Sequence, residues 1–273
     1  MNENNGFTYE LNNGIKIPSI GFGTWALNGK TAQKAVKWAL KAGYRLIDTA
    51  SMYGNEVEIG KAIKESSIKR EELFITTKIW DSEQGYENTF KAFERSLARL
   101  QVDYIDLYLI HWPRTKRLET WRAMEELYKQ DNKVVRAIGV SNFTIDHLNE
   151  LLRNSTIKPV INQVEFSPFL YQKDLLSYCN IHEIKVEAYA PLTRTEKFDN
   201  ATLQEISKKY GKTVPQILIR WGLEHGLVEI PKSSNKEHIF ENIDVFEFSI
   251  EDEDLKVLDS LNQDFRTVND PIF

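Results

Sequence analysis

Short apolar runs alternate with amphipathic stretches along most of the chain. Segments such as TAQKAVKWALKAG and GYENTFKAFERSLARL carry apolar residues at three- and four-residue spacing, which is typical of helices that bury one face. Gly43 is placed to end the first of these helices, and Ser141 or Asn142 is placed to cap the fifth. The apolar runs that separate the helical segments begin near Ser19 (SIGFG), Arg45 (RLID), Leu73 (LFITTK), Ile105 (IDLYLIHW), Ala137 (AIGVS), Val160 (VINQV), Lys185 (KVEAY) and Leu227 (LVEIPK).

Eight strand–helix repeats predict an α/β protein whose parallel strands close into a (β/α)₈ TIM barrel rather than an open sheet. The start of the chain has a different pattern. Phe7, Tyr9 and Leu11 alternate with polar residues, residues 12–14 (Asn-Asn-Gly) form a turn signal, and alternation resumes until Pro18. This pattern predicts an N-terminal β-hairpin. No linker-like stretch interrupts the 273 residues, so we expect one domain over residues 1–273.

Composition excludes several classes of function. The net charge is −5 and no Lys/Arg-rich block is present, so a nucleic-acid partner is not expected. No apolar run approaches the roughly 20 residues that span a bilayer, and MNENNGFTYE lacks the features of a secretory signal. We therefore expect a cytoplasmic protein with no membrane contact. The single cysteine, Cys179, is expected to fill the core.

Nearly every apolar run is followed by a residue whose side chain can donate or accept a hydrogen bond or stack on a ring. The active sites of such barrels lie at the carboxyl ends of the strands, so these positions are candidates. Taken singly, Asp48 suits a loop or helix cap, Tyr53 a packing residue, Lys78 a solvated strand end, and His111 a core histidine. Their joint occurrence at three successive strand ends makes them candidates, and the choice between these roles depends on the sequence strings around them. The later runs are followed by Ser141 and Asn142, by Gln163, by Tyr189, and by Lys232 and Ser233.

The strand ends and the loops after them resemble the aldo-keto reductase family. The matching stretches occur in the family's order over nearly the whole chain: GFGTW from Gly21, GYRLIDTASMYGNEVEIG from Gly43, LFITTKIW from Leu73, LQVDYIDLYLIHWP from Leu100, AIGVSNF from Ala137, INQVEFSPF from Ile161, AYAPL from Ala188 and IPKSSN from Ile230. The resemblance implies an NADP(H)-linked reductase of aldehydes or ketones. It also implies that the hairpin closes the bottom of the barrel.

The resemblance assigns four catalytic roles. Tyr53 is the expected general acid, which protonates the carbonyl oxygen as hydride reaches the carbon. Lys78 is expected to lower the pKa of Tyr53, because a unit charge at ~4 Å and an effective dielectric constant of about 20 contributes about 4 kcal/mol. Asp48 would keep Lys78 charged, and His111 would orient the carbonyl oxygen.

The resemblance also implies the cofactor contacts. Ser141, Asn142 and Gln163 match the residues that hydrogen-bond the nicotinamide carboxamide, and Tyr189 matches the aromatic residue that stacks on its ring. The rest of the cofactor is expected to contact Gly23 and Thr24, where the backbone approaches closely, and Asp48, Pro191 and Leu192. Lys232, Ser233 and Ser234 match the residues at the 2′-phosphate. Glu241 and Asn242 match the residues at the adenine.

One cofactor position departs from the family's pattern. NADPH-preferring members commonly place an arginine on the helix after the I-P-K-S segment, whereas this chain has His238. Arginine offers a permanent charge and a bidentate fork, and a free histidine is mostly neutral at pH 7.5. We therefore expect NADPH to be favoured by a reduced margin, with NAD(H) also usable.

Aromatic residues are expected around the substrate. The resemblance places Trp25, Trp80 and Trp112 on the pocket wall with His111, and Phe22 and Met52 are further candidates. The chain ends soon after Asn262, whereas longer members carry an additional loop over the pocket, so we expect an open, permissive site for a small-molecule carbonyl.

Two alternatives remain at this point, a cofactor-binding regulatory subunit like those of potassium channels and a metal-dependent barrel hydrolase. Turnover of a simple aldehyde with NADPH separates the first from a reductase. Metal-dependent barrel hydrolases usually carry a His-x-His pair after the first strand, whereas the first strand here ends in GFGTW, and a metal assay on the purified protein would decide. The sequence is read as that of a monomer.

Overall fold

The computed structural model describes residues 7–131 and 133–268 of the chain. Its parallel sheet has the order β10-β9-β8-β7-β6-β5-β4-β3. An isolated parallel bridge joins Ile20 to Glu229, and the Glu229 N–H donates to the Ser19 carbonyl oxygen at 2.9 Å, so the two edges meet and the predicted barrel is confirmed. The strands are β3 (Gly21–Gly23), β4 (Leu46–Asp48), β5 (Phe74–Ile79), β6 (Ile105–Ile110), β7 (Val135–Ser141), β8 (Ile161–Glu165), β9 (Lys185–Tyr189) and β10 (Val228–Glu229).

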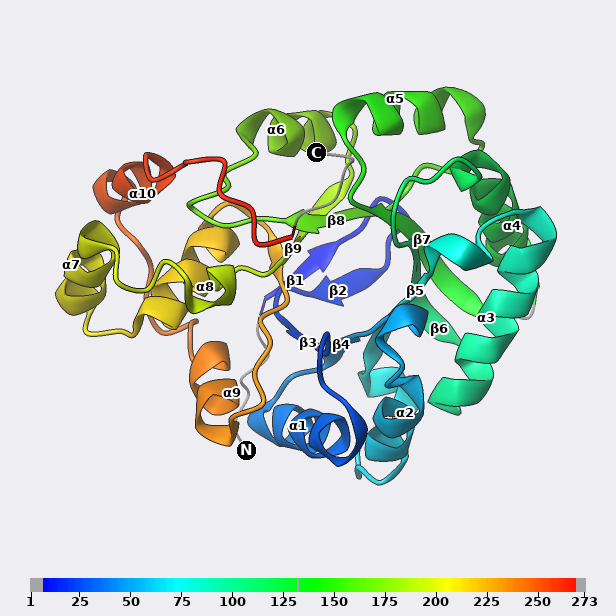
Figure 1. The fold of residues 1–273 in the computed structure, drawn as a ribbon, viewed down its shortest axis with the longest axis horizontal. Coiled ribbons are helices and arrows are strands. Elements are labelled where there is room, and N and C mark those ends of the chain that lie inside the picture. The colour runs from blue at the N-terminus through cyan, green and yellow to red at the C-terminus, as the bar shows by residue number, and fades with distance from the viewer. Residues whose placement is uncertain (1–6, 132, 269–273) are drawn as a thin grey trace.

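Helices surround this ring of strands on the outside (Figure 1). Two of them lie between β9 and β10, and two follow β10. The α-helices are α1 (Gly29–Ala42), α2 (Glu56–Lys64), α3 (Tyr86–Leu100), α4 (Arg117–Lys129), α5 (Ile145–Asn154), α6 (Lys173–Ile181), α7 (Ala201–Tyr210), α8 (Val214–Glu224), α9 (Lys236–Ile243) and α10 (Asp252–Asp259). Short 3-10 turns occur at η1 (Ser51–Tyr53), η2 (Arg70–Glu72), η3 (Asp81–Glu83) and η4 (Thr193–Thr195).

The helix ends show one expected and one unexpected cap. Gly43 closes α1 in the left-handed region, with φ of 111°. The prediction that Ser141 or Asn142 caps the fifth helix is wrong, because Thr144 does so by accepting from the His147 N–H. Ser141 ends β7, and Asn142 has a φ of 63°. The chain uses this left-handed residue to turn out of the strand, so the helix begins later than its polar signal suggested.

The hairpin closes the amino-terminal end of the barrel. β1 (Thr8–Glu10) pairs antiparallel with β2 (Lys16–Pro18), and Gly14 in the turn between them has a φ of 80°. Leu11 and Ile17 are buried in the smaller of two apolar clusters, together with residues from the starts of the barrel strands. The larger cluster fills the layer between strands and helices and includes Cys179, which is buried and unpaired. The carboxyl ends of the strands are thereby left as the accessible mouth.

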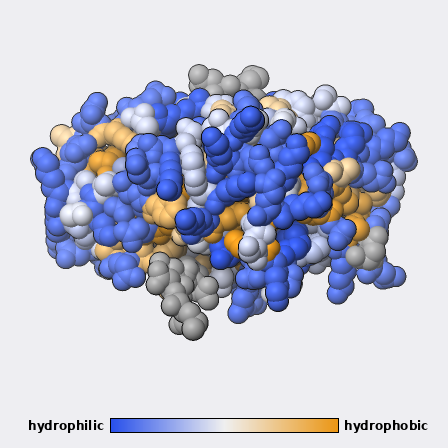
Figure 2. All heavy atoms as spheres, turned by 90° about the horizontal axis from the view of Figure 1, so that it is seen from below, coloured by the Kyte–Doolittle hydropathy of each residue, from blue (hydrophilic) through white to orange (hydrophobic). Residues whose placement is uncertain are grey.

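The surface carries no broad apolar area on the face drawn in Figure 2, where hydrophobic residues occur in small groups among hydrophilic ones. Within residues 7–131 and 133–268, no helix has both the length and the apolar character to cross a membrane.

Candidate active site

Three neighbouring strands bring the four expected catalytic side chains together. Asp48 ends β4, Lys78 lies near the end of β5, and His111 follows β6 directly. Tyr53 comes from η1, in the loop after β4. The Lys78 ammonium donates to Asp48 Oδ1 at 2.6 Å, to the Thr49 carbonyl oxygen at 2.9 Å and to the Tyr53 hydroxyl at 3.4 Å. Residues far apart in sequence thus form one connected group at the mouth of the barrel.

Lys78 is fully buried and nonetheless keeps its proton. Burial alone would lower the pKa of Lys78, but the charge of Asp48 and the contact with Tyr53 outweigh it and raise the pKa above its usual value. An ammonium removed from water is stable only when it is paired and hydrogen-bonded. Asp48 therefore holds a cation beside the Tyr53 hydroxyl.

Lys78 lowers the pKa of Tyr53 as expected, but the net pKa of Tyr53 lies above its ordinary value. Burial is the largest influence and raises the pKa, the charge of Lys78 lowers it, and the charge of Asp48 raises it again. The sequence argument counted the nearby cation and omitted desolvation, which disfavours a phenolate. Tyr53 is consequently protonated at neutral pH, as a proton donor must be, and Lys78 limits how far its pKa rises.

His111 is buried and neutral. Burial lowers its pKa well below the usual range, and the charges of Lys78 and Arg114 lower it further. Its ring lies edge-on to the ring of Tyr53, with 5.7 Å between centroids, and edge-on to Trp80 at 5.1 Å. A neutral imidazole has one N–H, so His111 can donate a hydrogen bond to an uncharged carbonyl oxygen without bringing a second full positive charge to the site.

Gln163 links this group to a carboxyl that the sequence analysis did not identify. Its Nε2 donates at 2.8 Å to Asp48 Oδ2 and at 2.8 Å to Glu187 Oε2. Glu187 lies in the middle of β9 and has no solvent exposure. The available signal was a charged residue inside the apolar run KVEAY, two positions before Tyr189 and therefore on the same face of the strand.

The expected carboxamide residues form a second connected group. Asn142 Nδ2 donates to the His111 carbonyl oxygen at 3.0 Å and to Ser141 Oγ at 3.1 Å. Ser141 Oγ in turn donates to the Gln163 carbonyl oxygen at 2.8 Å, and the Tyr189 hydroxyl donates to Asn142 Oδ1 at 2.9 Å. These bonds fix the side chains that surround the end of β8, and Tyr189 remains partly exposed there.

The residues expected near the phosphates and adenine lie in the loop between β10 and α9 and on α9 itself, away from the catalytic group. Lys232, Ser234 and His238 are exposed, and Ser233 and Glu241 are partly exposed. No carboxylate among the described residues lies within salt-bridge distance of Lys232, and burial followed by the charge of Arg194 lowers its pKa. The side chain of Asn242 is buried, and its Oδ1 has no partner in the described ranges.

The loops after β3 and β9 border the same region. The Gly23 N–H donates to the Pro231 carbonyl oxygen at 3.0 Å, and a Cβ at Gly23 would lie 2.9 Å from the Ile230 oxygen, so this position requires glycine. The Thr24 hydroxyl is already used, since it donates to the Asp48 carbonyl oxygen at 2.8 Å. Pro191 is buried and Leu192 is partly exposed in the loop after β9.

This loop is conformationally strained. Ala190, Thr193, Arg194 and Thr195 all have positive φ, between 49° and 71°. Such residues concentrate at ligand-binding segments, where the surrounding structure holds an unfavourable backbone in place. The Arg194 guanidinium lies 4.5 Å from the centroid of the Trp25 ring and so connects the loops after β9 and β3.

These features fit a nicotinamide dinucleotide. Buried polar atoms without a partner among the described residues include His111 Nδ1, Thr193 Oγ1 and Asn242 Oδ1. Lys232 supplies a cation for a phosphate, and Tyr189 supplies an aromatic ring near the four candidate catalytic side chains. No set of three His, Cys, Asp or Glu side chains in the described ranges is arranged to hold a metal ion.

The candidate substrate residues separate into two groups. Trp25 and Met52 are exposed at 45% and 40%, and Trp80 adjoins His111, so all three are available at the mouth. Trp112 is almost fully buried. Phe22 does not belong to this group, because it is buried against Tyr44 in the layer outside the strands, with ring centroids 5.7 Å apart. It alternates with two glycines on β3 and faces the helices.

The end of the described chain returns to the mouth of the barrel. Glu165, the last residue of β8, accepts from the Thr267 N–H and hydroxyl at 2.6 Å each and from the Val268 N–H at 3.3 Å. The Phe265 N–H donates to the Phe169 carbonyl oxygen at 3.0 Å. The segment after α10 thus passes over the loop that follows β8 (Figure 1). The described end of the chain therefore borders the mouth on this side, and the openness of the site stays a prediction.

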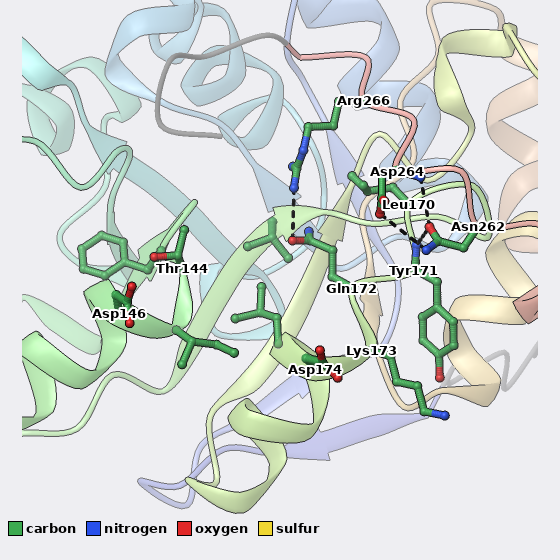
Figure 3. Close-up of a pocket in the computed structure, with 14 residues that line it drawn as sticks. Thr144, Asp146, Leu170, Tyr171, Gln172, Lys173, Asp174, Asn262, Asp264 and Arg266 are labelled. Atoms are coloured by element: carbon green, nitrogen blue, oxygen red, sulfur yellow. Dashed lines mark hydrogen bonds between the residues drawn. The ribbon is translucent and has the colours of Figure 1, made fainter.

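A hollow of about 720 Å³ lies between this returning segment and the loops after β7 and β8 (Figure 3). Within it, Arg266 donates to Gln172 Oε1 and the Tyr171 N–H donates to Asn262 Oδ1. None of the four candidate catalytic side chains lines this hollow. The hollow is thus separate from the candidate catalytic side chains, and Asp146, Asp174 and Asp264 border it.

Comparison with known proteins agrees with the fold. Residues 19–263 match the aldo/keto reductase family. The chain is 52% identical over 266 residues to a glyoxal reductase of Bacillus subtilis, which covers 97% of this chain and 96% of the relative.

Two solved structures are similar as well. An aldo-keto reductase enzyme from a Medee basin deep-sea metagenome library has a TM-score of 0.93 and 48% identity, and covers 96% of this chain and 97% of its own. A Bombyx mori aldo-keto reductase, solved in complex with NADP, has a TM-score of 0.91 and 36% identity, with 97% and 95% covered. The chain belongs to the aldo/keto reductase family.

Proposed function

We propose that this protein reduces small aldehydes, including α-dicarbonyl compounds such as glyoxal, to alcohols with NADPH. The observation that carries the proposal is the position of the Lys78 ammonium, 2.6 Å from Asp48 and 3.4 Å from the Tyr53 hydroxyl, beside a neutral His111. The substrate class is supported by the 52% identity to a glyoxal reductase.

The proposed roles follow from charge development at the carbonyl. NADPH, when bound, supplies the hydride that adds to the carbonyl carbon. As negative charge grows on the oxygen, Tyr53 transfers its hydroxyl proton to it, and the positive charge of Lys78 stabilises the resulting phenolate. Asp48 holds Lys78 in place, and His111 donates a hydrogen bond that orients the carbonyl oxygen.

Cofactor positioning is assigned to the second group of residues. Both Nε2 hydrogens of Gln163 are engaged within the protein, which leaves Oε1 to accept from the carboxamide. Ser141 and Asn142 border the same place, and Tyr189 stacks on the nicotinamide. At the other end, Lys232, Ser233 and Ser234 bind the 2′-phosphate, and Glu241 and Asn242 contact the adenine.

The test is a substrate panel with NADPH and NADH side by side. Glyoxal, methylglyoxal, an aryl aldehyde, a ketone, a keto-acid and an aldose would each be followed by oxidation of the reduced cofactor. We expect turnover with NADPH, fastest for the small aldehydes. A folded protein that binds NADPH and turns over none of these carbonyls would contradict the proposal and favour a cofactor-sensing regulatory subunit.

We also propose that the protein acts as a monomer in the cytoplasm. Its one cysteine is buried and unpaired, which is usual for proteins of a reducing compartment. Light scattering coupled to gel filtration tests the oligomeric state.

A further inference from the structure

Glu187 is a buried carboxyl for which the proposed mechanism has no role. It lies on β9, where it pairs in register with Gln163 on β8 and with Val228 on β10. Its side chain shares the inward face of the barrel with Tyr189, two residues later. A carboxyl group rarely occupies such a position unless it is paired.

The partner of Glu187 is the amide that also holds the catalytic aspartate. Gln163 Nε2 carries two hydrogens. It donates one to Asp48 Oδ2 and the other to Glu187 Oε2, and both hydrogen bonds are 2.8 Å long. Asp48 uses its second oxygen to bind Lys78. A continuous series of hydrogen bonds therefore runs from Glu187 through Gln163, Asp48 and Lys78 to the hydroxyl of Tyr53.

The charges around Glu187 differ from strand to strand. It faces Asp48 on β4 and Lys78 on β5 inside the barrel, and its charge raises the pKa of Glu229 on β10. Burial first and the negative charge of Asp48 second raise the pKa of Glu187 to about 8. Its Oε1 has no hydrogen-bond partner among the described residues. Near neutral pH Glu187 is thus mostly protonated, and it gains a full charge at alkaline pH.

We propose that Glu187 is a positioning residue for carbonyl reduction, which holds Gln163 so that its amide supports Asp48 against Lys78 and keeps Oε1 free for the cofactor. This inference rests on the proposed function. When Glu187 ionises, its charge favours the protonated forms of Lys78 and Tyr53. It therefore extends the range of alkaline pH over which Tyr53 retains the proton that it donates.

Two substitutions separate the charge of Glu187 from its geometry. Glu187→Gln preserves an oxygen that accepts from Gln163 and removes the ionisation. Glu187→Leu removes both. Glu229→Gln is the matched control, because Glu229 is a buried carboxyl on the neighbouring strand with a raised pKa and no hydrogen bond to Gln163 among the described residues.

The measurements are pH profiles of kcat and kcat/KM, and the Kd of NADPH from fluorescence. We expect Glu187→Gln to match the wild type near pH 6 and to lose activity earlier on the alkaline side, by on the order of half a pH unit. We expect Glu187→Leu to lower kcat about tenfold or more at every pH, since misplacement of catalytic groups is costly, and to raise the Kd of NADPH. Glu229→Gln should leave both profiles unchanged.

The proposal is overturned if the profile of Glu187→Gln superimposes on that of the wild type while Glu187→Leu keeps its kcat and Kd. It is also overturned if Glu187→Gln and Glu229→Gln lose activity equally at all pH values, because that result shows a purely structural role. Failure of the wild-type protein to reduce any carbonyl would instead remove the proposed function. The Kd series would in that case still test whether Glu187 positions Gln163.

Discussion

The hydroxyl of Tyr189 donates a 2.9 Å hydrogen bond to Oδ1 of Asn142, a residue held in a left-handed conformation with φ of 63°. Asn142 has the side chain that is expected to meet the carboxamide of the nicotinamide, and Tyr189 has the ring that is expected to stack on it. One hydrogen bond therefore couples two expected contacts of the cofactor.

Tyr189→Phe should consequently weaken NADPH binding several-fold and change kcat little, because the ring remains and only the restraint on Asn142 is lost. Tyr189→Leu should weaken binding more, since the stacking surface is lost too. The Kd of NADPH and kcat are the measurements. Equal Kd values for wild type and Tyr189→Phe would show that Asn142 does not need this restraint.

Tyr53→Phe should lower kcat for aldehyde reduction about a thousandfold, within the range for loss of a general acid, with NADPH binding retained. Only the hydroxyl is removed, and its proposed contribution arises in the transition state. Tyr9→Phe is the control, since its hydroxyl donates to the Leu223 carbonyl oxygen, away from the catalytic group. Retention of most of the kcat by Tyr53→Phe would refute the assigned mechanism.

Lys78→Met should remove most activity, and it should also destabilise the fold because the buried Asp48 loses its cation. Asp48→Asn should be milder in activity. The charge of Asp48 raises the pKa of Tyr53, so the alkaline limb of the Asp48→Asn profile should move to lower pH. An unmoved limb in kcat/KM profiles would count against a link between Asp48, Lys78 and Tyr53.

His238→Arg should raise the NADPH/NADH ratio of kcat/KM about tenfold, because a bidentate, permanently charged donor replaces a weaker one. His238 is exposed on the first turn of α9, near the segment with Lys232. His182→Arg, remote at the end of α6, controls for added charge, and an unchanged ratio in His238→Arg would rule out a cofactor role.

Glu187 should also make stability depend on pH. Its pKa is raised in the folded state, from 4.5 to about 8. A raised carboxyl pKa contributes stability that is fully present below the unfolded value, and that stability is lost as pH rises through the folded value. Between pH 5 and 9 the wild type should lose on the order of a few kcal/mol relative to Glu187→Gln. Thermal unfolding over this range gives the answer, and parallel curves for the two proteins would show that Glu187 does not titrate as stated.

The strand ends were predictable because strand, helix and turn signals are local. The apolar runs marked all eight barrel strands. The rule that active sites follow parallel strands made Asp48, Lys78 and His111 candidates, and the family resemblance gave them their expected roles. Facing direction was harder to infer on short strands. Side chains alternate between the two faces of a strand, so a shift of one residue reverses the direction in which Phe22 or Glu187 points. Only the register of the closed barrel decides which face each residue occupies.

Electrostatic balance was harder still to infer from sequence. The influence of Lys78 on Tyr53 could be anticipated from the family pattern, but burial of the phenol depends on everything packed around it. The same holds for Glu165, whose contacts with Thr267 and Val268 join segments about one hundred residues apart. No local pattern signals a carboxylate that fastens a distant segment.

The junction at which the barrel closes should become more stable when the cofactor binds. β3 and the two-residue β10 meet through the Ile20–Glu229 bridge and flanking hydrogen bonds. Candidate cofactor residues lie on both sides of this seam, Gly23 and Thr24 on one and Lys232 on the other. We expect a dinucleotide that contacts both sides to hold the first and last strands of the barrel together, so that its binding free energy adds to the resistance against opening. The amide hydrogens along the seam should therefore exchange more slowly when the cofactor is bound than in the free protein.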